Sequence, residues 1–230
     1  MKLIGLLGGM SWESTALYYR LMNEEVRNRL GGLHSARVIL HSVDFHEIEL
    51  RQHSGDWDGT AQILSDAAKG LKSGGADFLV IATNTMHKVA PQIEAASNLD
   101  ILHIADPTGE ALVRDGVRRV ALLGTRFTME QDFYRDRLAR KFGLDVLVPG
   151  DEDRNTIHRI IYDELCLGVT KPDSALAYVG IIARLQAKGA EAVILGCTEI
   201  TMIINAGNSP LPVYDTTRLH ALAAVERALS

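Results

Sequence analysis

Short runs of apolar residues alternate with longer amphipathic segments along nearly the whole chain of 230 residues. The apolar runs are rich in Val, Ile and Leu, which is typical of parallel strands buried on both faces. The amphipathic segments show the periodicity of helices with one buried face. We therefore predict an α/β fold with parallel sheets and helices on both sides. The predicted strands span 2–7, 36–43, 78–82, 120–123, 145–148 and 192–195, and the predicted helices span 11–29, 60–73, 88–96, 129–142, 153–167, 174–188 and 218–229.

The second half of this pattern repeats the first. Residues 75–84 match residues 189–198, which aligns Thr83 with Cys197 at an offset of 114. Three further pairs match at offsets of 115, 116 and 109, namely Tyr18-Tyr19 with Phe133-Tyr134, Leu6-Leu7-Gly8 with Leu122-Leu123-Gly124, and 102–108 with 211–217. Matches that follow chain order in this way indicate an internal duplication.

The duplication predicts two pseudo-symmetric α/β domains with central parallel sheets. We expect residues 1–100 and 212–230 to form the first domain and residues 101–211 to form the second. The carboxyl ends of parallel strands are the usual place for a ligand, so we expect an interdomain active-site cleft where these ends meet.

Composition and charge narrow the class of partner. The net charge is −5, which argues against a nucleic-acid footprint, and no apolar run approaches the roughly 20 residues of a membrane-spanning helix. The two cysteines do not make a disulfide scaffold and fit a reducing cytoplasm. The glycine loops match neither the dinucleotide nor the P-loop pattern, and the histidines lack metal-ligand spacing. We expect a cytoplasmic protein that binds a small molecule, with no metal, nucleic acid or membrane.

Cys197 is the principal candidate for chemistry, because it follows an apolar strand and begins a predicted helix. The exposed N–H groups of a helix N-terminus lower the pKa of a thiol, and Gly196 lets a ligand approach closely. The alternative is a buried, inert cysteine. That alternative is the better interpretation of Cys166, which stands among apolar residues of a predicted helix.

Polar side chains at the other strand ends suit a carboxylate. Asn84, Thr85 and Thr198 are short hydroxyl and amide groups at predicted helix starts, and the loops at Gly8 and Gly124 offer similar anion-binding geometry. The alternative for these loops is plain helix capping by Ser11 and Thr128. His87, one helical turn beyond Thr83, either lines the site or has a capping or packing role.

Four motifs together resemble the aspartate/glutamate racemase superfamily: Gly8-Gly9-Met10, Asn84-Thr85, Leu122-Leu123-Gly124-Thr125 and Gly196-Cys197-Thr198-Glu199. The resemblance spans nearly the whole chain. It is closest to the L-aspartate/glutamate-specific amino-acid racemases, on the strings G-G-M-S-W-E-S-T, T-N-T-M-H and G-C-T-E.

The resemblance implies two α/β domains, an interdomain site, a homodimer and racemisation without a cofactor. In the family one cysteine removes the α-proton of the amino acid and a second returns a proton from the opposite face. Carried over by position, Cys197 is the base for the L-enantiomer. Met10, Asn84, Thr85, Thr125 and Thr198 surround the substrate, the last four near its α-carboxylate.

The sequence departs from the family at Thr83, where the first cysteine should stand. A threonine hydroxyl is a poor base near neutral pH, so we expect reprotonation by Thr83 or by a water that it holds, with a low kcat from D to L. Arg51, with Gln52 beside it, is the candidate ligand of the distal carboxylate, and Arg126 competes for this role.

Two other functions stay open at this point. One is a decarboxylase or isomerase of the same superfamily, because some decarboxylases there keep only the second-half cysteine. The other is a non-catalytic amino-acid-binding protein that has lost its first cysteine.

Overall fold

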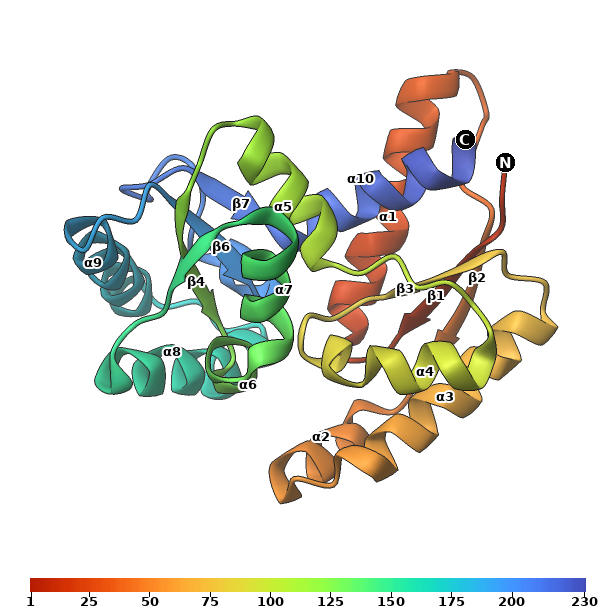
Figure 1. Cartoon of the computed structure of the whole chain (residues 1–230), viewed down its shortest axis with the longest axis horizontal. Helices are drawn as coiled ribbons and strands as arrows, with labels where there is room; N and C mark the ends of the chain where they lie inside the picture. Colours follow the sequence, from red (N-terminus) through yellow and green to blue (C-terminus); the bar gives the residue numbers. More distant parts are fainter. The chain divides into compact units, whose positions relative to one another are not determined.

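The computed structural model describes all residues from Met1 to Ser230 and divides them into two compact units. The first unit consists of Met1–Ile104 and Thr217–Ser230, and the second of Ala105–Thr216. Each unit has its own parallel sheet, flanked by helices (Figure 1). The predicted α/β class with two parallel sheets is therefore confirmed.

The first unit is built on a three-stranded sheet in the order β2-β1-β3. Its elements in chain order are β1 (Ile4–Gly8), α1 (Trp12–Leu30), β2 (Val38–Ser42), α2 (Phe45–Ser54), α3 (Trp57–Ser73), β3 (Phe78–Ile81), the 3₁₀ helix η1 (Thr85–Val89) and α4 (Ala90–Ser97). The helix α10 (Thr216–Leu229) also belongs to this unit, apart from its first residue.

Alternate residues of β1 and β3 face opposite layers of helices, as the two-residue period of a strand requires. Leu7 and Ile81 are fully buried in a cluster with α3 and α4. Leu6 and Val80 are fully buried in a second cluster, with α1 and α10. Figure 1 shows these helices on the two sides of the sheet.

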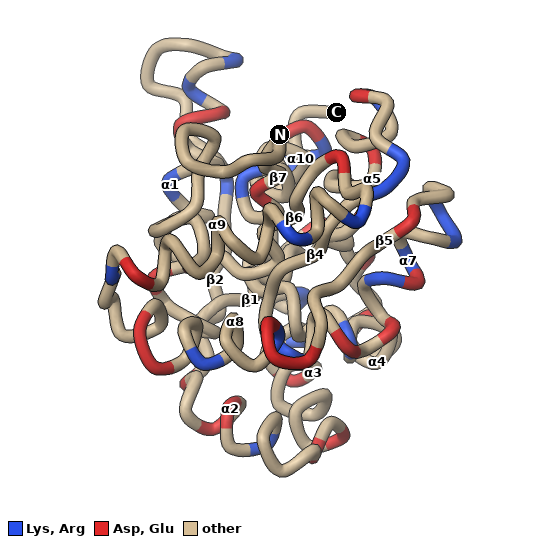
Figure 2. Tube along the Cα trace, turned by 90° about the vertical axis from the view of Figure 1, so that its left-hand side faces the viewer, with Lys and Arg blue, Asp and Glu red and all other residues tan.

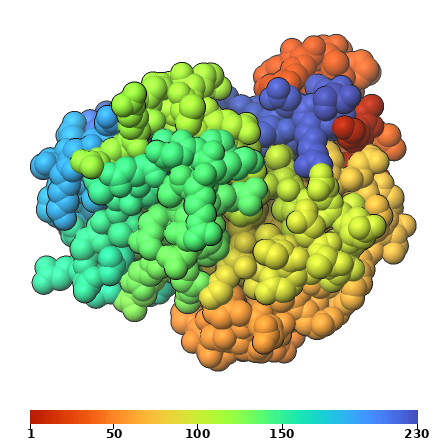
Figure 3. All heavy atoms as spheres, in the orientation of Figure 1, coloured from red at the N-terminus to blue at the C-terminus, as the bar shows by residue number.

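The end of the chain packs beside its beginning. The N–H of Lys2 donates to the carbonyl of Ala228 at 2.8 Å, and the last helix lies beside the N-terminal segment in the space-filling view (Figure 3). The hydroxyl of Tyr18 in α1 lies 2.8 Å from Nδ1 of His220 in α10. The predicted last helix therefore completes the first unit.

The second unit is built on a four-stranded sheet in the order β5-β4-β6-β7. Its elements are α5 (Ala105–Arg114), β4 (Arg119–Gly124), α6 (Arg126–Glu130), α7 (Asp132–Phe142), β5 (Asp145–Leu147), α8 (Asp151–Asp163), η2 (Leu165–Leu167), α9 (Pro172–Ala187), β6 (Ala192–Gly196), η3 (Thr198–Met202) and β7 (Val213–Asp215).

Helices cover both faces of this second sheet as well. Leu123 and Leu195 are buried in a cluster with α8 and α9. On the other side α5 and α7 pack together (Figure 1). Gly109 is required there because a Cβ atom would collide with the ring of Phe142.

Equivalent strands occupy equivalent places in the two sheets, which supports the internal duplication. The order β2-β1-β3 corresponds to β5-β4-β6. The bridge between Leu79 and Ile101 in the first unit has its counterpart in the pairing of Val193 with Val213 in the second. The repeated sequence pattern therefore corresponds to a repeated arrangement of strands in the two units.

Several elements differ from the sequence prediction. The helices α2 and α5 were not predicted, and the predicted helix over 129–142 is divided between α6 and α7 by the extended backbone of Gln131. The predicted helix over 153–167 ends at Asp163, so Cys166 lies in η2 and contacts the edge of the core.

Acidic and basic positions are interspersed along the helices of both units (Figure 2). Many form short-range ion pairs, such as Arg29 with Glu25 and Lys69 with Asp66. None of the helices is both long enough and apolar enough to cross a membrane.

Candidate active site

The loop after β1 is held by a network of short polar side chains. The N–H of Gly9 donates to Oγ1 of Thr15 at 2.8 Å, and the Thr15 hydroxyl donates to the carbonyl of Ser11 at 2.9 Å. Ser11 caps α1, as the capping alternative predicted, by accepting from the N–H of Ser14. Met10 lies within this loop and is buried.

The segment after β3 carries three of the predicted site residues. Thr83 is partly buried, whereas Asn84 and Thr85 are buried and lead into η1. The N–H of Ala82 donates to the carbonyl of Leu7 at 2.9 Å, so the end of β3 lies beside the end of β1. Met10 and Thr83 therefore lie at the same edge of the first sheet.

His87 contacts the backbone of the first unit through both of its ring nitrogens. Nδ1 lies 2.9 Å from the carbonyl oxygen of Thr83, and Nε2 accepts a hydrogen bond from the N–H of Ile104 at 3.2 Å. The side chain is buried, which agrees with the packing alternative. Burial lowers the pKa of His87 well below its usual value, and the neighbouring His103 and His220 lower it further.

Arg51 and Gln52 lie on α2 in contrasting environments. Gln52 is buried, and the Arg51 guanidinium is partly exposed and forms an ion pair with Asp56 at 2.5 Å. Asp56 also caps α3 through the N–H of Gly59. A Cβ atom at Gly59 would collide with Nη1 of Arg51. The sequence at the start of α3 therefore gives this guanidinium its space and its counter-charge.

Thr125 follows β4 in the second unit and has a structural role there. Its Oγ1 accepts from the N–H of Thr128 at 3.4 Å, so Thr125 is the N-cap of α6. The sequence interpretation that Thr128 caps this helix is wrong by one turn. The reason is that the helix already begins at Arg126, and the cap must precede its first residue.

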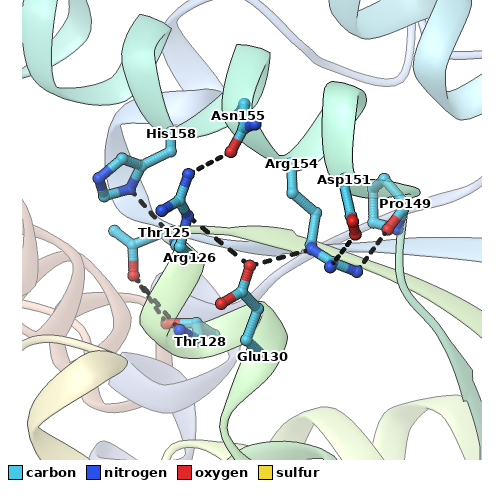
Figure 4. A network of polar contacts seen from close by, with 9 residues as sticks. All are labelled: Thr125, Arg126, Thr128, Glu130, Pro149, Asp151, Arg154, Asn155 and His158. Carbon is cyan, nitrogen blue, oxygen red and sulfur yellow. Dashed lines mark hydrogen bonds and ion pairs between the residues drawn. The ribbon is translucent and has the colours of Figure 1, made fainter.

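Arg126 takes part in a polar network between α6 and α8 (Figure 4). Its guanidinium donates to Asn155 and lies 3.6 Å from Oε1 of Glu130, and its backbone N–H donates to Nδ1 of His158 at 3.3 Å. Glu130 in turn binds Arg154 at 3.1 Å. This guanidinium is therefore already bound by neutral and acidic partners of its own unit.

Cys197 lies directly after β6, beside Thr125. Gly124 pairs with Gly196 in the parallel ladder between β4 and β6, so the residues that follow them are neighbours at one edge of the sheet. The thiol of Cys197 donates to Oε2 of Glu199 at 2.9 Å. Thr198 lies between these two residues and begins η3.

The pKa of the Cys197 thiol is raised well above its usual value, contrary to the sequence expectation. Burial is the largest cause, and the Glu199 carboxylate raises the pKa further by its charge and by accepting the thiol proton. The following helix is a short 3₁₀ helix of five residues, so its dipole is too small to lower the pKa of the thiol by much. The thiol is therefore protonated at neutral pH and has a base beside it.

Glu199 is the residue whose role the sequence reasoning missed. It stands in the motif Gly196-Cys197-Thr198-Glu199, whose pattern predicts roles for Cys197 and Thr198 only. The signal was its spacing, because a residue two positions beyond a strand end can turn back toward the side chain at that end. Only the conformation of η3 brings the two side chains into contact.

Comparison with known proteins places the chain in a family. The family model for Asp/Glu/hydantoin racemases matches residues 7–224. A putative Asp/Glu racemase from Yersinia pestis is 55% identical, with both chains covered completely and a TM-score of 0.94. An aspartate racemase homologue from Pyrococcus horikoshii OT3 is 36% identical over the whole of both chains, with a TM-score of 0.84. The broad specificity amino-acid racemase RacX of Bacillus subtilis strain 168 is 21% identical over 178 residues, which cover 76% of this chain and 75% of RacX.

The chain belongs to the Asp/Glu/hydantoin racemase family. The resemblance drawn from the strand-end motifs is confirmed, and so is the predicted enzyme class, an isomerase of the racemase type.

Proposed function

We propose that the protein is an amino-acid racemase that acts on L-aspartate and L-glutamate without a cofactor. The observation that carries the proposal is the contact of 2.9 Å between the Cys197 thiol and the Glu199 carboxylate at the end of β6. A racemase needs a base that can remove a weakly acidic α-proton. Here the base is the thiolate that forms when Glu199 accepts the thiol proton.

The proton then moves in two steps. The Cys197 thiolate takes the α-proton of the L-substrate, and the planar carbanion receives a proton on its opposite face from Thr83 or from a water that Thr83 holds. The equilibrium constant between enantiomers is one, so kcat/KM must be equal in both directions. The weak acid–base capacity of Thr83 therefore lowers kcat from D to L without making the reaction one-way.

Hydrogen-bond donors at the strand ends would stabilise the charge that develops on the α-carboxylate. We assign this role to Asn84, Thr85, Thr125 and Thr198. Met10 would contact the substrate beside them. Arg51 would bind the distal carboxylate, with Gln52 beside it. The partly exposed Arg51 guanidinium keeps donors beyond its contact with Asp56, since a guanidinium has five N–H groups. Arg126 is the second candidate, and Asn155 and Glu130 contact its guanidinium as Asp56 contacts that of Arg51.

We also keep the homodimer and the cytoplasmic compartment of the sequence prediction as part of this proposal. Both cysteines are free, the state that a reducing compartment maintains.

The experiment that tests the proposal is incubation of the protein with L-aspartate or L-glutamate in D₂O. The α-proton is followed by NMR, and the D-isomer by chiral chromatography. We expect exchange of the α-proton and slow formation of the D-isomer. Cys197→Ala should lower both rates by roughly 10³-fold or more, because it removes the base. Cys166→Ala is the matched control and should retain activity. Absence of exchange with both substrates would contradict the proposal.

A further inference from the structure

The side chain of His87 is buried beside the end of β3 and takes no part in the proposed proton transfers. Both ring nitrogens of His87 have a partner in the backbone of the first unit. A backbone N–H can only donate, so Nε2 must carry a lone pair toward Ile104. A carbonyl oxygen can only accept, so Nδ1 must carry the proton toward Thr83. The two partners therefore require one neutral tautomer.

The surroundings of His87 support the same protonation state. The ring of His103 lies 4.5 Å from that of His87, centroid to centroid, and the ring of His220 lies at 5.8 Å. His220 also has two partners, the Leu102 carbonyl at 2.7 Å and the Tyr18 hydroxyl at 2.8 Å. A positive charge on His87 would be unfavourable in this buried cluster, and a proton on Nε2 would face the N–H of Ile104.

We propose that His87 is a positioning residue, whose Nδ1–H holds the carbonyl of Thr83 and thereby fixes the direction of the Thr83 and Asn84 side chains. The peptide plane between Thr83 and Asn84 contains the bonded carbonyl, so the hydrogen bond restrains the backbone torsions on both sides of it. Its other nitrogen ties this plane to Ile104, at the end of the first segment of the unit. The proposal rests on the proposed function, because Thr83 is there the group that reprotonates the substrate.

Two substitutions separate the two hydrogen bonds of His87. In His87→Asn the side-chain amide nitrogen is attached at Cγ, as Nδ1 is, and can still donate to the Thr83 carbonyl. In His87→Gln the amide oxygen reaches the place of Nε2 and can still accept from Ile104, but the donor to Thr83 is lost. Each variant loses one buried hydrogen bond, so a purely structural role predicts similar effects for both.

The measurement is the ratio of D-isomer formation to α-proton exchange in L-glutamate dissolved in D₂O. Exchange needs only the Cys197 side of the substrate, whereas inversion also needs the Thr83 side. We expect His87→Gln to lower this ratio by about tenfold or more, because small displacements of a reacting group are costly. We expect His87→Asn to keep the wild-type ratio. Equal ratios in the two variants, whether lowered or unchanged, would overturn the proposal.

A second measurement does not depend on activity. Hydrogen–deuterium exchange of a peptide covering residues 83–86 should speed up in His87→Gln and stay near wild type in His87→Asn. Protection that is the same in both variants would overturn the positioning role. Absence of α-proton exchange in the wild-type protein would instead contradict the proposed function, so the two failures are distinguishable.

Discussion

At the scale of single residues, the environment of Cys197 sets its chemistry more than its place in the sequence does. A thiol at the start of a helix is expected to be acidic. Here burial and the neighbouring Glu199 carboxylate raise its pKa instead. A protonated thiol with a base in contact is stable at rest and can be deprotonated when the substrate arrives, because the ammonium group of an amino acid favours the thiolate.

This interpretation makes opposite predictions for reactivity and catalysis in Glu199→Gln. Loss of the carboxylate lowers the pKa of Cys197, so we expect faster alkylation by iodoacetamide near pH 8, measured by peptide mass spectrometry. Racemisation should become about 10²–10³-fold slower, because an amide cannot accept the thiol proton. Cys166 in the same protein is the internal control for alkylation. Slower alkylation of Cys197 in the variant would contradict this account.

At the scale of elements, the turns that follow the strands bring the site residues together within each unit. The paired ends of β1 and β3 place Met10 near Thr83, and the pairing of Gly124 with Gly196 places Thr125 beside Cys197. The turn after β1 depends on Gly9, whose φ is +93° and whose backbone lies against Val43. A Cβ atom there would collide with the N and O atoms of Val43.

We therefore expect Gly9→Ala to destabilise the protein more than a glycine substitution that meets only backbone strain. Gly116→Ala is the matched control, because Gly116 has a φ of +77° and no atom within 4 Å of the added Cβ. The control should cost about 1–2 kcal/mol, and Gly9→Ala roughly 1–3 kcal/mol more through overpacking. Urea unfolding of the two variants measures the difference. An equal decrease in the free energy of unfolding for the two variants would contradict this prediction, because it would mean that the turn can move to accommodate the added methyl group.

At the scale of the whole molecule, the chain completes its first unit only with its last helix. The histidine in that helix, His220, lies near His87 and contacts Leu102, so residues far apart in sequence form one buried cluster around His87. Protonation of His87 is opposed by its burial and by the neighbouring His103 and His220. In the folded protein His87 therefore binds a proton less readily at mildly acidic pH than it does in the unfolded chain.

The cluster predicts a loss of stability as the pH falls. The pKa of His87 is lowered in the folded state, whereas an unfolded histidine titrates near 6.5. Below about pH 6.5 this histidine is protonated in the unfolded chain but stays neutral in the folded protein. The free energy of unfolding therefore decreases by at most about 1.4 kcal/mol per pH unit for this group. Urea unfolding at pH 7.5 and pH 5 should show a smaller decrease in His87→Asn than in the wild type. An equal or larger decrease in the variant would contradict the assignment.

Much of the fold could be predicted because its strands are continuous apolar runs. The predicted strand over 78–82 is β3, and that over 192–195 is β6, each within one residue at either end. The helix α2 was missed because only Ile48 and Gln52 are buried along it, so it lacks a clear apolar periodicity. The contacts of Arg126 with Asn155 and His158 could not be predicted either, because these residues lie about 30 positions away on α8 (Figure 4).

The sequence by itself determined the α/β class, the internal duplication and the family, because buried strands and strand-end motifs are local patterns. Its motifs also contained Cys197 and Glu199. The tertiary structure alone decided how these residues behave: it brought the carboxylate to the thiol, raised the pKa of that thiol, and enclosed His87 among partners that permit one neutral tautomer. The physical reason is that a pKa and a tautomer depend on burial and on neighbours in space, which a linear pattern does not contain.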